Sequence, residues 1–511
     1  MERAVKKLLI LGGGSAGWLT AGIIAAEHGE RLDVTLVESP NVPTIGVGEG
    51  TWPSMRETLR KIGVSESSFI TECDASYKQG SKFVGWKTGQ ASDFYYHPFS
   101  LPHGFFDVNC IPAWQQQVPH PAFADAVSAQ PTVCEQGLAP KQLGTPEYAA
   151  VVNYAYHLDA AKFGVFLQKH CCDKLGVTHI VDHVAEVRST EDGYIESLGT
   201  EQHGLLEADL FIDCSGGASM LLGKHYQEPF VSRQSVLFND RALAVQVPYT
   251  RPDQAIASVT LSTAQRAGWI WDIGLPTRRG VGYVYSSAHS SDEQAEQDLR
   301  AYLAPSIGKK NAETAAFRQL KINPGHRASF WRKNCVAVGM SAGFIEPLEA
   351  SALALVELSA ALIRDSMPAN RSLMDIAARR FNERFQYRWD RVIDFLKLHY
   401  VLSHRNDSEY WSDHRSTTTI PARLQELLDL WRYQSPSRLD FVQTEEIFPA
   451  ASYQYVLYGM GFRTDDSAMT RRSADVELAE RYFHENKAQV QRLLQGLPSN
   501  RDLLDKIRQS L

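Results

Sequence analysis

The chain has 511 residues, of which 44% are hydrophobic and 22% are charged, and its formal net charge at pH 7 is −7. These fractions are typical of globular proteins and exclude disordered and fibrous classes. The mildly acidic balance also argues against nucleic acid as a partner. A length that allows about three domains favours an enzyme that encloses a ligand.

The N-terminal residues predict a nucleotide-binding βαβ unit. The apolar run at 7–11 predicts a strand, residues 18–28 a helix, and residues 33–37 a second strand. The glycines between the first strand and the helix have the GxGxxG spacing, which lets the backbone approach a pyrophosphate at a helix N-terminus. The acid that ends the second strand is placed to accept a hydrogen bond from a ribose hydroxyl. The candidate cofactor contacts are therefore Gly12, Gly14, Ser15, Ala16, Gly17 and Glu38.

Three later segments extend this pattern. A glycine-rich loop lies at 45–51, a strand enters a glycine turn at 209–217, and residues 335–339 lead through a loop to a predicted helix at about 350–364. Such elements, spread over more than 300 residues, favour FAD over NAD. The N-terminus of the last helix would then face the flavin and stabilise its anionic reduced form.

The remaining segments predict the parts that cover a substrate. Residues from about 73 to 150 are rich in aromatics, Pro and His and predict loops, whereas residues from about 240 to 290 predict strands. Apolar residues recur at helical spacing over 373–402 and 476–494. We expect an α/β fold (α+β overall), with a discontinuous FAD module at 1–370 that contains the segments at 73–150 and 240–290. A mostly helical substrate module follows at 371–511.

The seven cysteines show no CxxC or Cys/His ligand spacing, so we expect reduced thiols, a cytoplasmic protein and no metal site. Lys6 and Lys7 precede an uncharged stretch that imitates a signal peptide. Three consecutive glycines at 12–14 interrupt its apolar character. We therefore expect neither a targeting segment nor a membrane span.

Five sequence blocks together suggest a family. They are GGGSAGW at 12–18, GVGEGTWPS at 46–54, SYKQGSKFVGW at 76–86, GWIWDI at 268–273 and GFIEPLEAS at 343–351. In identity, order and spacing this set resembles the flavin-dependent halogenases of the tryptophan-halogenase type over most of the chain. The Trp-x-Trp-x-Ile signature, here Trp269, Trp271 and Ile273, distinguishes that family from the related aromatic hydroxylases.

The resemblance implies an FAD module of the single-component flavin monooxygenase kind and a small aromatic substrate. It also implies a separate NAD(P)H-dependent flavin reductase that delivers FADH2, and a monomer or homodimer. Lys78 and Glu349 match the family's catalytic residues, and the backbone amides of Ser351 and Ala352 match its halide site. Further contacts that the resemblance implies are Gly48, Glu49, Met340 and Leu353 for FAD, and His97, Phe99 and Tyr453 for the substrate.

The implied chemistry explains these residue types. FADH2, O2 and halide give hypohalous acid at the flavin, a small and unselective oxidant that must be guided to the substrate. Lys78 can hydrogen-bond this acid or form a haloamine, and both alternatives stay open. Glu349 can align the acid, stabilise the cationic ring intermediate and accept its proton. Trp269 and Trp271 would form a wall between flavin and substrate.

Two departures from the family pattern narrow the substrate. Ala350-Ser351-Ala352 stands where most tryptophan halogenases have Ser-Thr-Gly, which leaves room for a larger halide. Residues 448–455 do not reproduce the tyrosine-rich, acid-containing segment that grips free tryptophan. We expect indole or another electron-rich aromatic as substrate and a brominase that accepts bromide at least as well as chloride. The alternatives are an aromatic hydroxylase and a flavoprotein that binds an aromatic ligand without turnover.

Overall fold

The computed structural model describes residues 4–42, 48–90, 92–443, 446–465 and 476–510. The chain divides into two compact units, each built from three stretches. The first unit comprises residues 1–75, 158–234 and 323–389, and the second comprises residues 76–157, 235–322 and 390–511. The chain thus changes unit inside helix α11 (Met374–Val401). The expected boundary of the cofactor and substrate modules at residue 370 stays a prediction.

A six-stranded sheet forms the centre of the first unit, with the order β20-β21-β12-β1-β2-β8. All strands except β20 run parallel. The central strands β1, β12 and β21 are buried almost throughout, as expected of a parallel sheet covered on both faces, whereas the edge strand β8 is partly exposed. Their bounds are Trp331–Arg332 (β20), Cys335–Ala337 (β21), Leu210–Asp213 (β12), Lys7–Leu11 (β1), Asp33–Glu38 (β2) and Thr178–Val181 (β8). The strands predicted at 7–11 and 33–37, and the strand predicted within 209–217, are therefore confirmed, and the segment at 335–339 begins with strand β21.

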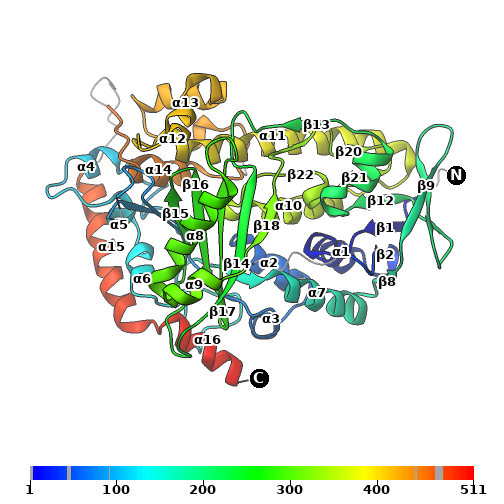
Figure 1. Ribbon diagram of the computed structural model, residues 1–511, viewed down its shortest axis with the longest axis horizontal. Helices are drawn as coiled ribbons and strands as arrows, with labels where there is room; N and C mark the ends of the chain where they lie inside the picture. The colour runs from blue at the N-terminus through cyan, green and yellow to red at the C-terminus, as the bar shows by residue number, and fades with distance from the viewer. Residues whose placement is uncertain (1–3, 43–47, 91, 444–445, 466–475, 511) are drawn as a thin grey trace. The chain divides into compact units, whose positions relative to one another are not determined.

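Helix α1 (Ser15–His28) packs against α7 (Ala160–Leu175) and α10 (Ser351–Asp365) beside this sheet (Figure 1). Asp159 caps α7 by accepting hydrogen bonds from two backbone amides of its first turn, and Gly176 ends it in a left-handed conformation. The helices predicted at 18–28 and 350–364 are confirmed. The unit also contains β3 (Gly48–Gly50), α2 (Ser54–Lys61), α3 (Glu66–Glu72), β9 (Val184–Ser189), β10 (Ile195–Thr200), β11 (Leu205–Glu207), β13 (Phe230–Ser232), β19 (Gly325–Arg327) and β22 (Gly343–Phe344).

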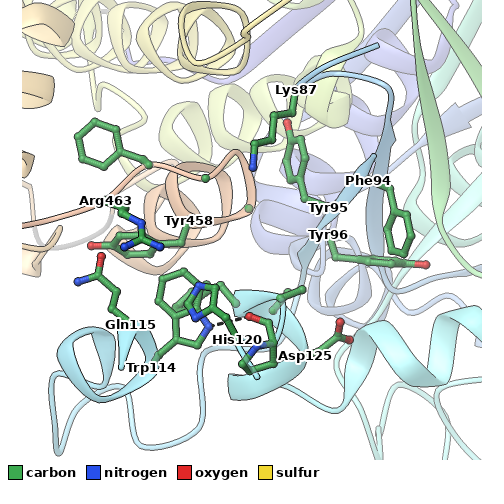
Figure 2. Close-up of a pocket in the computed structure, with 17 residues that line it drawn as sticks. Lys87, Phe94, Tyr95, Tyr96, Trp114, Gln115, His120, Asp125, Tyr458 and Arg463 are labelled. Atoms are coloured by element: carbon green, nitrogen blue, oxygen red, sulfur yellow. Dashed lines mark hydrogen bonds between the residues drawn. The ribbon is translucent and has the colours of Figure 1, made fainter. Parts of the chain in front are cut away.

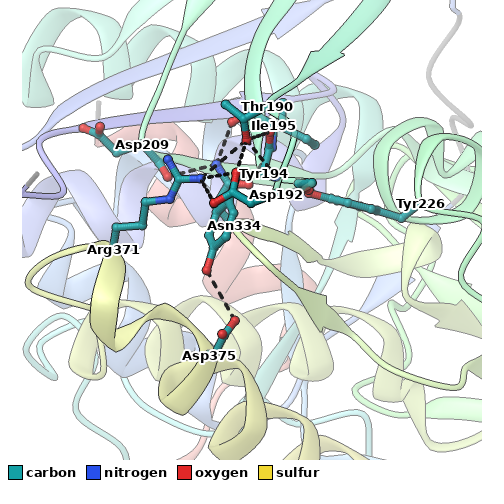
Figure 3. A network of polar contacts seen from close by, with 10 residues as sticks. Thr190, Asp192, Tyr194, Ile195, Asp209, Tyr226, Asn334, Arg371 and Asp375 are labelled. Atoms are coloured by element: carbon teal, nitrogen blue, oxygen red, sulfur yellow. Dashed lines mark hydrogen bonds and ion pairs between the residues drawn. The ribbon is translucent and has the colours of Figure 1, made fainter.

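A polar network ties the β9–β10 hairpin to the start of α11 (Figure 3). The Arg371 guanidinium lies 3.9 Å from the centre of the Tyr194 ring and 2.8 Å from an Asp192 carboxylate oxygen. The Asn334 side chain donates to the Ile195 carbonyl at 2.8 Å and accepts from its N–H at 2.9 Å. These contacts fix an outlying hairpin to the rest of the first unit.

A seven-stranded sheet forms the centre of the second unit, with the order β18-β14-β17-β16-β15-β5-β6. Only β15 and β5 pair in parallel within it. Helix α8 (Asp292–Ile307) packs its apolar face against this sheet, where Leu299 and Leu303 join a core with Ile270 and Tyr283. The strands are Arg318–Lys321 (β18), Arg241–Pro248 (β14), Arg278–Tyr285 (β17), Gly268–Gly274 (β16), Thr260–Gln265 (β15), Gly80–Val84 (β5) and Phe94–Pro98 (β6). The strands predicted between 240 and 290 are confirmed.

The prediction that residues 73–150 form loops is wrong for much of that segment. It contains β4 (Ser76–Lys78), β5 and β6, and three short helices: α4 (Ile111–Gln115), α5 (Phe123–Val127) and α6 (Gln130–Glu135). The strands form through pairing with distant residues, since β5 lies beside β15. Pro98 is tolerated because it ends an edge strand, and Pro112 and Pro131 lie in the first turns of their helices.

Helices complete the second unit. They are α12 (Glu409–His414), α13 (Ala422–Trp431), α14 (Ala450–Gly459), α15 (Val476–Gly496) and α16 (Asn500–Gln509), with α9 (Lys309–Thr314) after α8. The predicted helices at 373–402 and 476–494 are confirmed as α11 and α15. Within the described part of the chain, no helix is long and apolar enough to cross a membrane.

Candidate active site

The first turn of the nucleotide-binding motif depends on glycine at two positions. Gly12 has φ +119°, and a Cβ there would lie 2.2 Å from the Cys214 carbonyl oxygen. A Cβ at Gly17 would lie 1.8 Å from the Gly12 carbonyl oxygen. Gly14, by contrast, is exposed and has open space around it. The turn therefore packs closely against its neighbours on one side and offers bare backbone on the other, as a pyrophosphate site requires.

The turns after β1, β12 and β21 meet at one edge of the sheet, because these strands are parallel neighbours. The Ser341 hydroxyl donates to the backbone carbonyls of Asp213 and Val338, and the Ser219 hydroxyl donates to the Ser341 carbonyl at 3.1 Å. A Cβ at Gly339 would lie 2.9 Å from the Ala16 methyl group. The three strand-to-glycine segments thus converge at the position where open α/β sheets bind their ligands.

The other expected FAD contacts lie in the same unit. The Glu38 carboxylate, at the end of β2, lies 2.7 Å from His179 Nε2. The surrounding protein desolvates Glu49 in β3 and raises its pKa to about 7. Met340 is 43% exposed, whereas Leu353 is buried in α10. Residues 45–47 of the predicted glycine-rich loop lie outside the described residues.

Glu349 and Ala350 have an unusual backbone conformation directly before α10. Their φ angles are +64° and +54°, which places two consecutive residues with side chains in the left-handed region. Strain of this kind costs about 1–3 kcal/mol per residue and is concentrated at functional sites. The Trp52 indole N–H donates to the Glu349 carbonyl at 2.7 Å, and the Ala350 N–H donates to the Pro347 carbonyl at 2.9 Å. These bonds stabilise the conformation. Glu349 itself is buried, with 7% of its surface exposed.

The strained pair opens the N-terminus of α10. Ser351 is the first helical residue, and no side chain caps this end of the helix within the described structure. The N–H groups of Ser351 and Ala352 belong to the first turn, where amides have no partner inside the helix and carry a partial positive charge. Such a terminus is suited to a small anion such as a halide.

Glu357 is a buried acid of α10 outside the sequence motifs. It lies two turns into α10 and is 4% exposed. Its carboxylate accepts hydrogen bonds from Thr58 at 2.5 Å and from Ser54 at 3.2 Å, which connects α10 to α2. Burial raises the pKa of Glu357 to about 7. No motif indicated this residue, because its role depends on two helices that are far apart in sequence.

Lys78 is buried in the second unit. It ends β4, pairs with Ala155 on β7 (Ala155–Asp159), and is only 1% exposed. Its ammonium nitrogen lies 5.4 Å from the centre of the Phe99 ring. His157, also on β7, lies 2.8 Å from the Thr260 hydroxyl. Burial, and then the charge of Lys78, keep the pKa of His157 well below its usual value, so this histidine is neutral at pH 7.

The expected substrate residues His97 and Tyr453 contact the same aromatic ring. The centre of the Phe395 ring lies 5.6 Å from that of His97 and 4.9 Å from that of Tyr453. Phe448 stacks on Phe395 at 3.9 Å. The Tyr453 hydroxyl is buried without a hydrogen-bond partner among the described residues, and burial raises its pKa. Phe395 has no sequence signal beyond its place in the helical pattern of α11.

Trp269 and Trp271 lie on β16 with ring centres 6.4 Å apart, in agreement with the expectation that alternate strand residues share a face. A Cβ at Gly282 on β17 would lie 2.1 Å from the Trp271 ring, so the indole covers this glycine. Ile273 is also buried. The candidate residues therefore form two groups: one with Glu349 and the nucleotide turns in the first unit, the other with Lys78 and the aromatic residues in the second.

The tryptophan halogenase family model matches residues 7–475. The chain belongs to this family. A tryptophan halogenase from Shewanella frigidimarina NCIMB 400 has a structure similar to this halogenase, with a TM-score of 0.96 and 52% identity over 99% of this chain and 98% of that one. Tar14, a tryptophan C-6 flavin-dependent halogenase from taromycin biosynthesis, gives a TM-score of 0.91 and 34% identity over 98% and 100%. Tryptophan 6-halogenase SttH of Streptomyces toxytricini is 33% identical over 96% of each chain.

These likenesses identify a flavin-dependent halogenase enzyme and do not favour the hydroxylase or the non-catalytic flavoprotein. The expected Rossmann-type FAD module is confirmed. The residues of the first unit fit FAD, since Gly14 offers open backbone and Met340 an exposed apolar side chain. Members of the family use halide, an aromatic substrate and a separate flavin reductase.

Proposed function

We propose that this halogenase attaches bromine or chlorine, supplied as bromide or chloride, to an electron-rich, indole-type aromatic by electrophilic substitution, with Lys78 and Glu349 as its catalytic residues. Reduced FAD and halide each supply two electrons to O2, which yields hypohalous acid, water and oxidised FAD. The observation that carries the assignment is the burial of Lys78 beside aromatic side chains. Lysine is rarely fully buried unless it is paired, and Lys78 is 1% exposed.

Lys78 has the chemistry to control an unselective oxidant. Its ammonium can donate a hydrogen bond to hypohalous acid and polarise the bond to the halogen, and its neutral amine can form a haloamine. The contact with Phe99 supports a location where an aromatic substrate meets the activated halogen. His157 is neutral, so it adds no second positive charge beside Lys78. Both routes require the same buried nitrogen.

We assign halide binding to the first amides of α10 and proton transfer to Glu349. The amides of Ser351 and Ala352 can hold halide at the positive end of the helix. The Glu349 carboxylate can stabilise the cationic ring formed by halogen addition. It can also accept the proton whose loss from that ring restores aromaticity. Because Ala350 and Ala352 have small side chains, we expect room for bromide as well as chloride.

An indole ring is the substrate feature that the second unit suits best. His97, Phe395, Phe448 and Tyr453 form a buried cluster of rings, a surrounding that suits an aromatic substrate. The relatives are named for tryptophan, which carries the same ring. Trp269, Trp271 and Ile273 would separate this site from the flavin, so that oxidant meets halide before it meets substrate.

We further propose a cytoplasmic location, where a separate reductase draws on NAD(P)H. The seven cysteines are all free, which suits a reducing compartment.

A turnover screen with reductase, NADH, FAD and O2 tests the substrate and halide. Indole and tryptophan are each supplied with bromide or chloride, and products are identified by mass spectrometry. We expect halogenated indole, with bromide at least as effective as chloride. A strong preference for tryptophan with chloride would reject this substrate assignment, and a product 16 mass units heavier would indicate hydroxylation instead.

A further inference from the structure

A cavity of about 330 Å³ lies in the second unit, outside the candidate active site. Neither Lys78 nor His97, Phe99, Tyr453 or either tryptophan of β16 lines it. It lies between β6, helices α4 and α5, and the C-terminal end of α14. This volume is at the lower end of the range for small-molecule sites, which run from about 300 to 1,000 Å³.

Aromatic side chains form the walls of the cavity (Figure 2). Trp114 is buried, and its indole N–H donates to the Pro121 carbonyl at 3.0 Å. Its ring centre lies 5.1 Å from Phe123 and 5.4 Å from Tyr458. Tyr96 packs into the same core from β6. These rings are already fixed by their own contacts, so a planar ligand would need little rearrangement to bind among them.

Two cationic side chains enter the cavity beside these rings. The Lys87 ammonium lies against Gly461, where a Cβ would come within 2.4 Å of its nitrogen. Arg463 also lines the cavity, and its side chain is exposed. Neither the Lys87 ammonium nor the Arg463 guanidinium has an ion-pair or hydrogen-bond partner in the part of the chain that the structure describes.

Asp125 is the acid among the lining residues, and Figure 2 places it apart from both cations. Desolvation, and then the neighbouring Glu135 carboxylate, raise the pKa of Asp125. Glu135 is itself engaged by Lys82 and Tyr96. Among the described residues, no other carboxylate lines the cavity beside the two cations.

We propose that this cavity is a second ligand site, which binds a small aromatic carboxylate. The ring of the ligand would stack among Trp114, Phe123 and Tyr458, and its carboxylate would pair with Lys87 and Arg463. Charge-assisted hydrogen bonds to a carboxylate are stronger than those to a neutral group, and desolvation by the aromatic walls increases the difference. A neutral analogue of the same shape should therefore bind much more weakly.

Two fluorinated probes of matched shape test this selectivity. The binding of 5-fluoroindole-3-acetate and 5-fluoroindole-3-acetamide to the full chain is followed by ¹⁹F NMR titration. We expect the acid to bind at least about tenfold more tightly than the amide, which corresponds to about 1.4 kcal/mol. Equal affinities, or no binding of the acid at millimolar concentration, would overturn the proposal.

Variants then locate the site. The double variant Lys87→Met, Arg463→Gln should lose the preference for the acid, whereas the exposed Lys310→Met should retain it. Ala122→Trp adds a ring at the lining of the cavity and should weaken the binding of the acid severalfold. Since Lys87, Ala122 and Arg463 are at least partly exposed, we expect all variants to fold, and thermal unfolding checks this. If the double variant or Ala122→Trp binds the acid as the wild type does, the acid occupies another site and the proposal fails.

Discussion

The two units of this halogenase position their candidate reactive groups by different physical means. In the first unit, Glu349 and the halide-binding amides are set by backbone geometry within a few residues: two positive φ angles and the start of a helix. In the second unit, Lys78 is set by strand pairing with Ala155 and by contact with Phe99. The first arrangement is local in sequence, and the second depends on packing between distant segments.

This difference determines how each group responds to mutation. A locally strained backbone is sensitive to the shape of the residue that adopts it, even when that residue makes few contacts. At a buried ammonium, removal of the charge leaves the polar groups that compensated it without a partner, so the function of the site depends on that charge. Substitutions at these residues should therefore separate changes in catalysis from changes in stability. The four predictions below are given in order of expected effect, the largest first.

The Lys78→Ala variant should show the largest loss. We expect halogenation to fall by about 10²–10⁴-fold, because the group that guides hypohalous acid is missing. Product formation is measured by mass spectrometry while NADH and O2 consumption continue. Lys82→Met is the matched control, since Lys82 lies nearby on β5 and pairs with Glu135. If Lys78→Ala still halogenates at the wild-type rate, Lys78 does not guide the hypohalous acid.

Glu349→Gln tests the corresponding group of the first unit. The amide keeps the size and burial of the side chain but cannot accept a proton, so we expect kcat to fall about 10²–10³-fold. The unfolding temperature should change little, because the backbone conformation is kept. Steady-state kinetics and thermal unfolding measure the two effects. Full activity in this variant would limit Glu349 to a structural role.

Glu357→Gln should change the pH dependence of stability. The pKa of Glu357 is about 7 in the folded chain and 4.5 in a model peptide, so the folded state holds its proton over a range in which the unfolded state has lost it. Stability therefore falls as pH rises from about 4.5 to 7. Glu357→Gln should remove this fall and gain about 1–3 kcal/mol at pH 8 relative to pH 4.5. Urea unfolding at both pH values measures it, with the exposed Glu27→Gln as control. Parallel pH profiles in wild type and variant would contradict the assignment.

Ala350→Val tests the strained backbone itself and should have the smallest effect. A β-branched residue tolerates φ +54° less well than alanine, and we expect a loss of about 1–2 kcal/mol. The control is Ala361→Val in the middle of α10, where only the small difference in helix propensity applies. Thermal unfolding compares the two. Equal losses would show that the left-handed conformation carries no special cost.

The same difference explains how much the sequence could predict. The strands and glycine turns of the first unit follow from local spacing, so the sequence alone indicates Gly12 and Gly17, the two positions that require glycine. The segment at 73–150 was expected to form loops, because the strand β5 depends on β15, about 180 residues away. Phe395, His157 and Glu357 were missed for a related reason. Each acts through a neighbour from a distant segment, which no local pattern indicates.

The alternation of side chains along β6 has a consequence for engineering. Tyr96 joins the aromatic core beside the cavity, and the next residue, His97, packs against Phe395 of the substrate cluster. One strand thus contributes to both the cavity and the substrate cluster. An insertion or deletion of one residue would reverse the face on which each later side chain of β6 lies, and would disrupt both regions at once.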